Sequence, residues 1–104
     1  MRQFLIRYRR GSTDADTWHR DVAAFIAALD GDAELSGKIS YRCMRIADSD
    51  DYLHLAAPAD EAAIKTLQSR DYFKRYNERT RQVAADGKVE VLKLDVVAET
   101  KNRG

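Results

Sequence analysis

Four segments of the sequence predict β-strands. Apolar and polar residues alternate over residues 3–9, with the two-residue period of a strand. Residues 38–46 and 52–57 predict the two arms of a hairpin, joined at residues 48–51 by Asp and Ser side chains that favour turns. Residues 89–98 are apolar on both faces, so this last strand needs cover on both sides.

Two further segments predict helices. Over residues 14–30, apolar residues recur every three or four positions, which indicates one buried stripe. Thr13 is the expected N-cap of this helix, and Gly31 is placed to end it. Residues 60–85 predict a second helix whose apolar stripe changes phase. We therefore expect a break beside Ser69, with Ser69 capping the second piece.

The order strand, helix, hairpin, helix, strand predicts a ferredoxin-like α+β domain with the pattern β-α-β-β-α-β. Its four-stranded antiparallel sheet would carry both helices on one face. We expect a single domain over residues 1–104, with residues 99–104 as a loose tail.

Two helices can cover only one face of such a sheet. We expect the other face to carry Tyr52, His54 and half of the last strand. Because an exposed apolar face usually marks an interface, the sequence predicts a homodimer that packs sheet against sheet.

Composition narrows the cellular setting and the partners. The chain has 44% hydrophobic residues, 34% charged residues and a net charge of +1. This balance gives no sustained field for nucleic acid or an anionic membrane, so we expect neither as a partner. The N-terminal apolar run is too short for a signal peptide, no stretch approaches a membrane span, and Cys43 is the single cysteine. The sequence predicts a soluble, cytoplasmic protein.

Several familiar site patterns are missing from the sequence. Two histidines and one cysteine, scattered along the chain, match no zinc-ligand spacing. The acidic run at residues 48–51 lacks the glycine and distal glutamate of a calcium loop. No phosphate-binding or dinucleotide-binding glycine motif is present. Residues 51–57 lack the basic-Gly-aromatic pattern of RNA-recognition strands. We therefore expect no metal and no cofactor.

Two stretches carry a resemblance to a known family: YLHLAAPADEA at residues 52–62 and LQSRDYFKRY at residues 67–76. Together with the order of elements, they resemble the dimeric α/β barrel superfamily, in particular its antibiotic-biosynthesis monooxygenase-like group. The resemblance spans residues 2–99. It implies a dimeric barrel and a pocket between sheet and helices that holds a flat aromatic molecule. Several members of the group oxidise polycyclic phenols or quinols with molecular oxygen and no metal or flavin.

A subset of the same group degrades haem, and the sequence departs from that pattern. Ala57 stands where the subset has a tryptophan at the end of the third strand. Arg75 or a neighbour stands where the subset has its iron-ligating histidine, and the second helix contains no histidine. The sequence therefore argues against haem degradation.

His54 and three tyrosines are the candidate catalytic or ligand-binding residues. Histidine titrates near physiological pH, so His54 could move a proton; the alternative is a hydrogen-bonded interface histidine. Tyr41, Tyr72 and Tyr76 could offer hydroxyl groups to a phenolic or keto oxygen. They could equally be core residues with a solvated tip.

Three more residues are candidates for substrate binding. Trp18 lies in the buried stripe of the first helix, as a core residue that could also form a pocket wall. Arg7 and Arg42 could hold an anionic oxygen or pair with carboxylates at an interface. His19 is expected at the surface, and Cys43 as a buried structural thiol.

Three functions remain open at this point. The resemblance implies a cofactor-independent monooxygenase acting on an aromatic phenol or quinol, with His54 or a tyrosine accepting the substrate proton. The second is a non-catalytic dimer that binds a ligand or regulates. The third is an isomerase of small lactones or keto acids. The sequence leaves open whether the protein is an enzyme.

Overall fold

The computed structural model describes residues 2–101. Its strands are β1 (Arg2–Arg9), β2 (Ile39–Arg45), β3 (Asp51–Pro58) and β4 (Glu90–Asp95). Its helices are α1 (Ala15–Asp30), α2 (Glu61–Gln68) and α3 (Asp71–Val83), followed by a 3-10 helix, η1 (Ala85–Gly87). The order β-α-β-β-α-α-β matches the prediction, with the second predicted helix divided in two.

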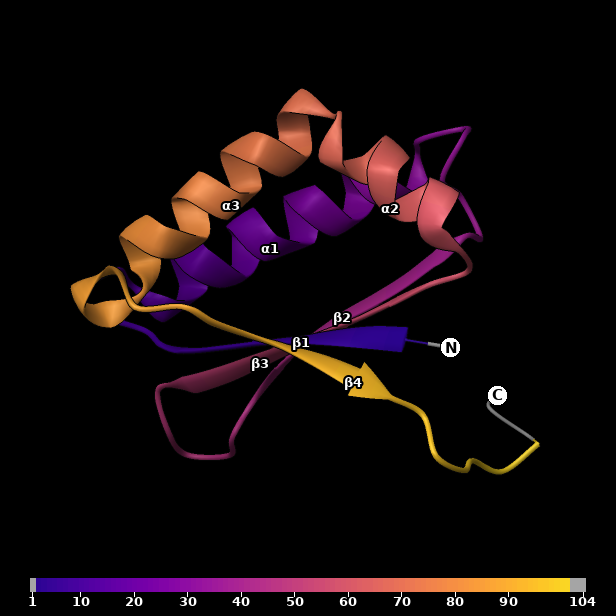
Figure 1. Ribbon diagram of the computed structural model, residues 1–104. Coiled ribbons are helices and arrows are strands. Elements are labelled where there is room, and N and C mark those ends of the chain that lie inside the picture. Colours follow the sequence, from indigo (N-terminus) through magenta and orange to yellow (C-terminus); the bar gives the residue numbers. More distant parts are fainter. Residues whose placement is uncertain (1, 102–104) are drawn as a thin grey trace.

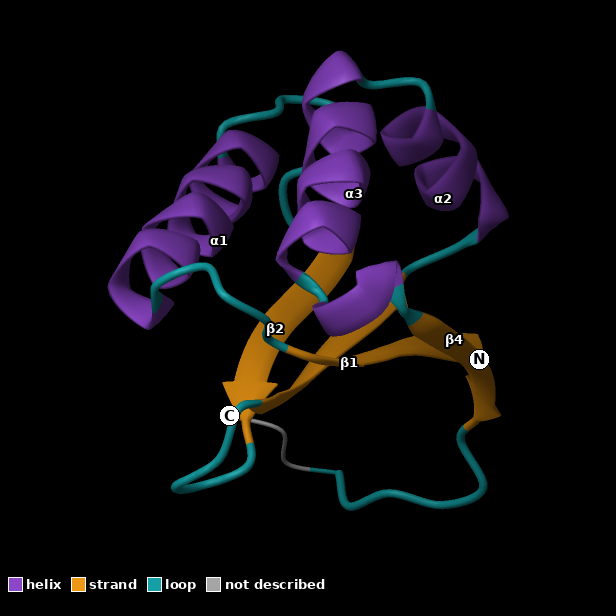
Figure 2. Cartoon of the chain, turned by 90° about the vertical axis from the view of Figure 1, so that its left-hand side faces the viewer, coloured by secondary structure: helices purple, strands orange, loops and turns teal. Residues whose placement is uncertain are grey.

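The strands form one antiparallel sheet in the order β2-β3-β1-β4. All three α-helices lie on one face of this sheet, and the opposite face carries no helix (Figure 1). Turned by 90°, the molecule shows α1 and α3 side by side above the sheet, with α2 beyond α3 (Figure 2). The predicted ferredoxin-like α+β fold is therefore confirmed.

The first helix begins one residue later than the sequence pattern indicates. Its N-cap is Asp14, not Thr13: the Asp14 carboxylate accepts a hydrogen bond from the Thr17 backbone N–H at 3.1 Å. Aspartate at this position satisfies an otherwise free N–H and carries a favourable charge near the helix N-terminus. Gly31 ends the helix as predicted.

The predicted break in the second helix is present, but Ser69 plays a different part in it. Ser69 directly follows α2 as its C-cap residue, and its hydroxyl donates to the Thr66 carbonyl at 2.6 Å. The chain then passes through the extended backbone of Arg70 before α3 begins, without a side-chain cap. The change of phase in the apolar stripe therefore predicted the break, whereas the predicted cap was wrong.

The last strand is shorter than predicted. It ends at Asp95, and Val97 beyond it is 96% exposed. Apolar residues on both faces suggested a longer strand, but β4 is an edge strand that pairs only with β1. Of the predicted loose tail, residues 99–101 belong to no helix or strand, and residues 102–104 lie outside the described part of the chain.

The register of β3 corrects the predicted location of His54. His54 pairs with Ile6 and Tyr52 with Tyr8, so all four side chains point toward the helices. Tyr52 and His54 are each only 1% exposed. The expectation that both lie on the uncovered face is therefore wrong.

The uncovered face is apolar because of its leucines, and not because of Tyr52 or His54. Its leucines come from β1, β3 and β4 and are all partly exposed: Leu5, Leu53, Leu55, Leu92 and Leu94. The buried core lies on the other side, between the sheet and the stripe of α1.

Within residues 2–101, no helix has both the length and the apolar content that a membrane span requires.

Candidate functional site

A cavity of about 370 Å³ lies between the sheet and the second pair of helices, α2 and α3. Most of its wall is apolar, formed by Phe4, Ile6, Ile39, Ala56, Pro58, Ile64, Leu67, Phe73, Val89 and Val91. The polar side chains of the wall are Tyr41, His54, Gln68, Tyr76, Asn77, Thr80 and Arg81. An apolar cavity with a few polar groups is the usual form of a small-molecule site.

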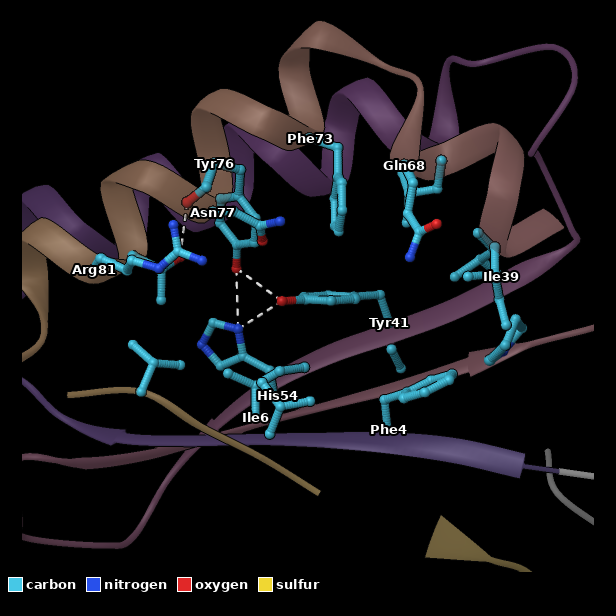
Figure 3. Close-up of a pocket in the computed structure, with 17 residues that line it drawn as sticks. Phe4, Ile6, Ile39, Tyr41, His54, Gln68, Phe73, Tyr76, Asn77 and Arg81 are labelled. Carbon is cyan, nitrogen blue, oxygen red and sulfur yellow. Dashed lines mark hydrogen bonds between the residues drawn. The ribbon is translucent and has the colours of Figure 1, made fainter. Parts of the chain in front are cut away.

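Three of the polar residues meet in a hydrogen-bonded triangle in the wall of the cavity, with Arg81 to one side of it and Gln68 to the other (Figure 3). The Nδ1 atom of His54 lies 2.6 Å from the Tyr41 hydroxyl and 3.0 Å from the Tyr76 hydroxyl. The two hydroxyls lie 3.0 Å apart. Strands β2 and β3 and helix α3 each supply one member, so residues distant in the sequence converge on one point.

The other ring nitrogen of His54 faces the core. Its Nε2 atom lies 2.7 Å from the Tyr8 hydroxyl, and the same hydroxyl accepts a hydrogen bond from Trp18 Nε1 at 2.7 Å. Both nitrogens of the imidazole therefore have a hydrogen-bond partner, and His54 is almost completely buried. This is the pattern expected of a buried polar group that folding must satisfy.

Aromatic stacking holds the cluster in place. The Tyr76 ring stacks on Phe25 with ring centres 3.9 Å apart and an interplanar angle of 3°. The Tyr76 ring also lies nearly parallel to the Trp18 ring, with ring centres 6.0 Å apart. Both partners come from the buried stripe of α1, and no residue of α1 lines the cavity itself.

Burial sets the protonation states of the cluster around His54. Loss of water lowers the pKa of His54 to about 4, so the imidazole is neutral at pH 7. Burial also raises the pKa values of Tyr8, Tyr41 and Tyr76 well above 10, so all three phenols keep their protons. The cluster is uncharged, and it offers hydrogen bonds rather than an ionic contact.

Four of the predicted site residues belong to this arrangement. Tyr41, His54 and Tyr76 line the cavity. Trp18 is completely buried behind them and reaches the cluster through Tyr8, so it is a core residue and not a wall of the cavity.

The remaining candidates lie elsewhere. Tyr72 donates its hydroxyl to the Asp32 carboxylate at 2.7 Å, away from the cavity. Arg7 and Arg42 point to the uncovered face because they alternate with the cavity-facing residues of β1 and β2. Arg7 there pairs with Glu90. Within this chain, none of the three is brought to His54.

The other two predicted structural residues fall close to expectation. His19 is exposed, although its Nε2 atom lies 2.7 Å from the Tyr52 hydroxyl. Cys43 is partly buried, and burial raises the pKa of its thiol to about 11. A thiol with so little thiolate at pH 7 is a poor nucleophile.

Sequence reasoning missed three residues of α3 that line the cavity, and it missed the hydroxyl of Tyr8. Phe73, Asn77 and Arg81 follow one another at intervals of four residues and line the cavity from α3. That spacing is a readable signal, because residues four apart share one face of a helix. Tyr8 shares a strand face with Ile6, which also could have been read from the alternation.

The described residues, 2–101, contain no group of three or more His, Cys, Asp or Glu side chains that could hold a metal ion. Neither a protein-family model nor a curated protein matches this sequence. Solved structures do match the fold of the chain. The structure of SnoaB, a cofactor-independent oxygenase from Streptomyces nogalater, superposes with a TM-score of 0.75 at 14% identity and covers 97% of each chain.

Two further structures agree with this similarity. Rv0793 from Mycobacterium tuberculosis gives a TM-score of 0.76 at 13% identity and covers 96% of this chain and 98% of its own. A candidate antibiotic biosynthesis monooxygenase from Caulobacter crescentus gives 0.76 at 18% identity, over 93% and 90% of the two chains. The chain has the fold of antibiotic biosynthesis monooxygenases. At these identities the likeness establishes the monooxygenase-like fold, and the chemistry must be argued from the site.

Proposed function

We propose that this protein is a small cofactor-independent monooxygenase that oxidises an aromatic phenol or quinol in the cavity beneath α2 and α3. The observation that carries the proposal is the apolar cavity whose wall holds the hydroxyls of Tyr41 and Tyr76, both bonded to the buried His54. The apolar wall suits a flat ring system, and the two hydroxyls suit one oxygen atom on that ring. The fold shared with SnoaB, which is a cofactor-independent oxygenase, supports the same reaction class.

The proposed chemistry uses the substrate as its own reductant. The substrate binds as its phenolate, with the phenol proton released to bulk water, because His54 and the two tyrosines are poor proton acceptors at pH 7. A hydroxyl donor at hydrogen-bond distance stabilises the anionic oxygen. The electron-rich ring then reduces molecular oxygen. One oxygen atom enters the ring and the other leaves as water, so a phenol becomes a quinone. Tyr41 and Tyr76 would orient the substrate and stabilise its anion.

The first experiment is a thermal-shift screen of the purified protein against polycyclic phenols and quinols, small lactones, amino acids and haem. A ligand that binds only the folded state raises the melting temperature. Compounds that shift it are then tested for oxygen uptake. We expect flat phenols or quinols to give the shift and to consume oxygen with the protein.

Two variants and one control then test the site. Tyr76→Phe removes a hydroxyl from the wall of the cavity, and His54→Gln removes the imidazole that holds both hydroxyls. We expect each to lower the rate of oxygen uptake by about a hundredfold or more, the usual effect of one lost oxyanion donor. His19→Gln changes the other histidine, which lies outside the cavity, and should leave the rate unchanged. Unchanged rates in both site variants would refute this assignment.

A specific observation favours one alternative, a non-catalytic ligand-binding protein. Both nitrogens of His54 are already hydrogen-bonded, and its pKa of about 4 makes it a weak base at pH 7. A binding protein needs only the hydrogen bonds of the cavity. Such a protein would show a thermal shift with the same aromatic compounds and no oxygen uptake.

We also propose that the protein forms a homodimer through the uncovered face of the sheet. The five partly exposed leucines of that face form the apolar surface that a second copy would cover. Replacing Leu55 by Asp, near the middle of this face, should produce a monomer in a solution-mass measurement. Ala23→Asp, on an exposed position of α1, is the matched control. A wild-type protein that is monomeric at micromolar concentration would contradict the proposal.

A further inference from the structure

His54 and four residues around it form a chain of hydrogen bonds whose direction follows from their chemistry. Trp18 Nε1–H can only donate, and it donates to the Tyr8 hydroxyl. The hydrogen of the Tyr8 hydroxyl then needs an acceptor of its own. Among the hydrogen bonds of the described residues, the one acceptor for it is His54 Nε2, at 2.7 Å. Nε2 must therefore carry no hydrogen.

The same reasoning continues through the ring to the cavity. A neutral imidazole carries one hydrogen, so it lies on Nδ1, which donates to Tyr41 at 2.6 Å. The Tyr41 and Tyr76 hydroxyls lie 3.0 Å apart, and either one can donate to the other. Whichever donates, the hydrogen of one of the two hydroxyls has no acceptor left within the cluster, and both residues line the cavity. The cluster therefore presents a hydrogen-bond donor to the cavity.

The opposite direction leaves a defect in the core. If the hydrogen were on Nε2, Tyr8 would accept from both Trp18 and His54, and its own hydrogen would have no acceptor. Tyr8 is only 4% exposed, so water does not easily replace that partner. A buried donor without an acceptor is costly, which disfavours this tautomer. In that tautomer, both tyrosine hydroxyl hydrogens would find acceptors within the triangle, so the hydroxyls would only accept hydrogen bonds from a ligand.

We propose that Tyr8 and Trp18 hold His54 in its Nδ1–H tautomer, and that this makes the cavity select ligands whose oxygen accepts a hydrogen bond. Neither residue lines the cavity, so both are positioning residues. The acceptor class comprises aromatic ketones, quinones and phenolates, as opposed to ligands whose only polar group is an N–H donor. The choice of ligand rests on the proposed function, whereas the tautomer of His54 does not.

The tautomer is tested without any ligand. Long-range proton–nitrogen NMR distinguishes a ring nitrogen that carries hydrogen from one that does not, and the chain has only two histidines to assign. We expect His54 to carry its hydrogen on Nδ1. The variant Tyr8→Phe removes the hydroxyl and keeps the ring, so both tautomers should become populated. Observation of the Nε2–H tautomer in the wild type would overturn the proposal.

The control for this variant is Tyr52→Phe. Tyr52 stacks on Tyr8 with ring centres 5.5 Å apart, is equally buried, and directs its hydroxyl to His19 instead of His54. It should leave the His54 tautomer as in the wild type. If Tyr8→Phe left the tautomer unchanged, or if Tyr52→Phe shifted it by as much, Tyr8 would not be the residue that sets it.

Selectivity is tested with three flat tricyclic probes of similar shape. Fluorenone offers only an acceptor, carbazole offers only an N–H donor, and fluorene offers neither. We expect the wild type to bind fluorenone about tenfold more tightly than carbazole, since the wrong partner leaves a buried polar group unpaired. Tyr8→Phe should reduce this ratio toward one, and Tyr52→Phe should preserve it. A wild type that prefers carbazole would overturn the proposed selectivity.

The two experiments separate this inference from the proposed function. If none of the probes binds, the cavity is not a site for flat aromatic molecules, and both the proposed function and the proposed selectivity fail. The NMR result would then still decide whether Tyr8 sets the tautomer. Binding of fluorenone without any oxygen uptake from phenols would support the selectivity and refute the monooxygenase proposal.

Discussion

The buried neutral His54 predicts that the protein loses stability when the pH falls from 7 to 5. In the unfolded chain a histidine titrates near 6.5, whereas burial lowers the pKa of His54 in the folded protein to about 4. Between these two values the unfolded state binds a proton that the folded state does not. The free energy of unfolding must therefore decrease as the pH falls through this window.

The size of this effect follows from the two pKa values. Each pH unit inside the window lowers the free energy of unfolding by about 1.4 kcal/mol. Over the whole interval from 6.5 to about 4 the loss is about 3 kcal/mol. The upper part is the cleaner test, because carboxylates titrate mostly below about pH 5. From pH 6.5 to pH 5 we expect a loss of about 2 kcal/mol.

The assay is urea unfolding at several pH values and one fixed protein concentration. Trp18 is the only tryptophan, it is completely buried, and its ring centre lies 6.5 Å from that of His54. Its fluorescence therefore reports on the core that contains the histidine. Because small proteins lose about 1–3 kcal/mol of stability per molar urea, the midpoint should fall by about 1 M between pH 6.5 and pH 5.

The control is a pair of variants that each remove one histidine. His54→Gln should be less stable than the wild type at pH 7 and should show little further loss by pH 5. His19→Gln, in which the exposed histidine is changed, should keep the wild-type dependence on pH. A wild-type midpoint that stays constant from pH 7 to pH 5 would refute the reasoning, and so would a His54→Gln variant with the wild-type slope.

Three further predictions concern Asp32, Cys43 and Phe25. Hydrogen bonds from Arg70 and Tyr72 lower the pKa of Asp32 to about 2, so part of the stability should be lost as the pH falls from 3.8 to about 2. Circular dichroism follows the acid unfolding, and Asp32→Asn should remove this part of the pH dependence. Cys43, with a thiol pKa of about 11, should react with a disulfide reagent about a hundredfold more slowly than a free cysteine, and a fast reaction would contradict its burial. Phe25→Ala should lower the free energy of unfolding by about 3–5 kcal/mol, measured in urea, because it leaves a cavity against Tyr76; a loss below about 1 kcal/mol would show that the stack is not held tightly.

The order of the elements was readable from the sequence because hydrophobic period is a local property. Alternation along β1 and the stripe of α1 each depend on residues within one segment. The break beside Ser69 was readable for the same reason, since one continuous helix would have had to bury Asp71. Helix caps were less readable, because Thr13 and Asp14 both have side chains that can accept the capping hydrogen bond.

The membership of the site was only partly readable. Tyr41, His54 and Tyr76 stood out by residue type, and the structure brings them together. Tyr72 and Arg7 stood out for the same reason and lie elsewhere. Residue type shows which hydrogen bonds or proton transfers a side chain can make. The tertiary structure decides whether a suitable partner lies within reach.

What the sequence by itself determined is therefore the fold class, the approximate bounds of its elements and a short set of chemically able residues. What only the tertiary structure decided is the face of the sheet on which His54 lies. Both faces of β3 carry large residues, with Tyr52 and His54 on one and Leu53 and Leu55 on the other, so alternation alone could not assign them. His54 faces the helices because it pairs with Ile6 and because the helices pack over that face of the sheet. A shift of one residue in this register would have sent every side chain of the strand to the opposite side.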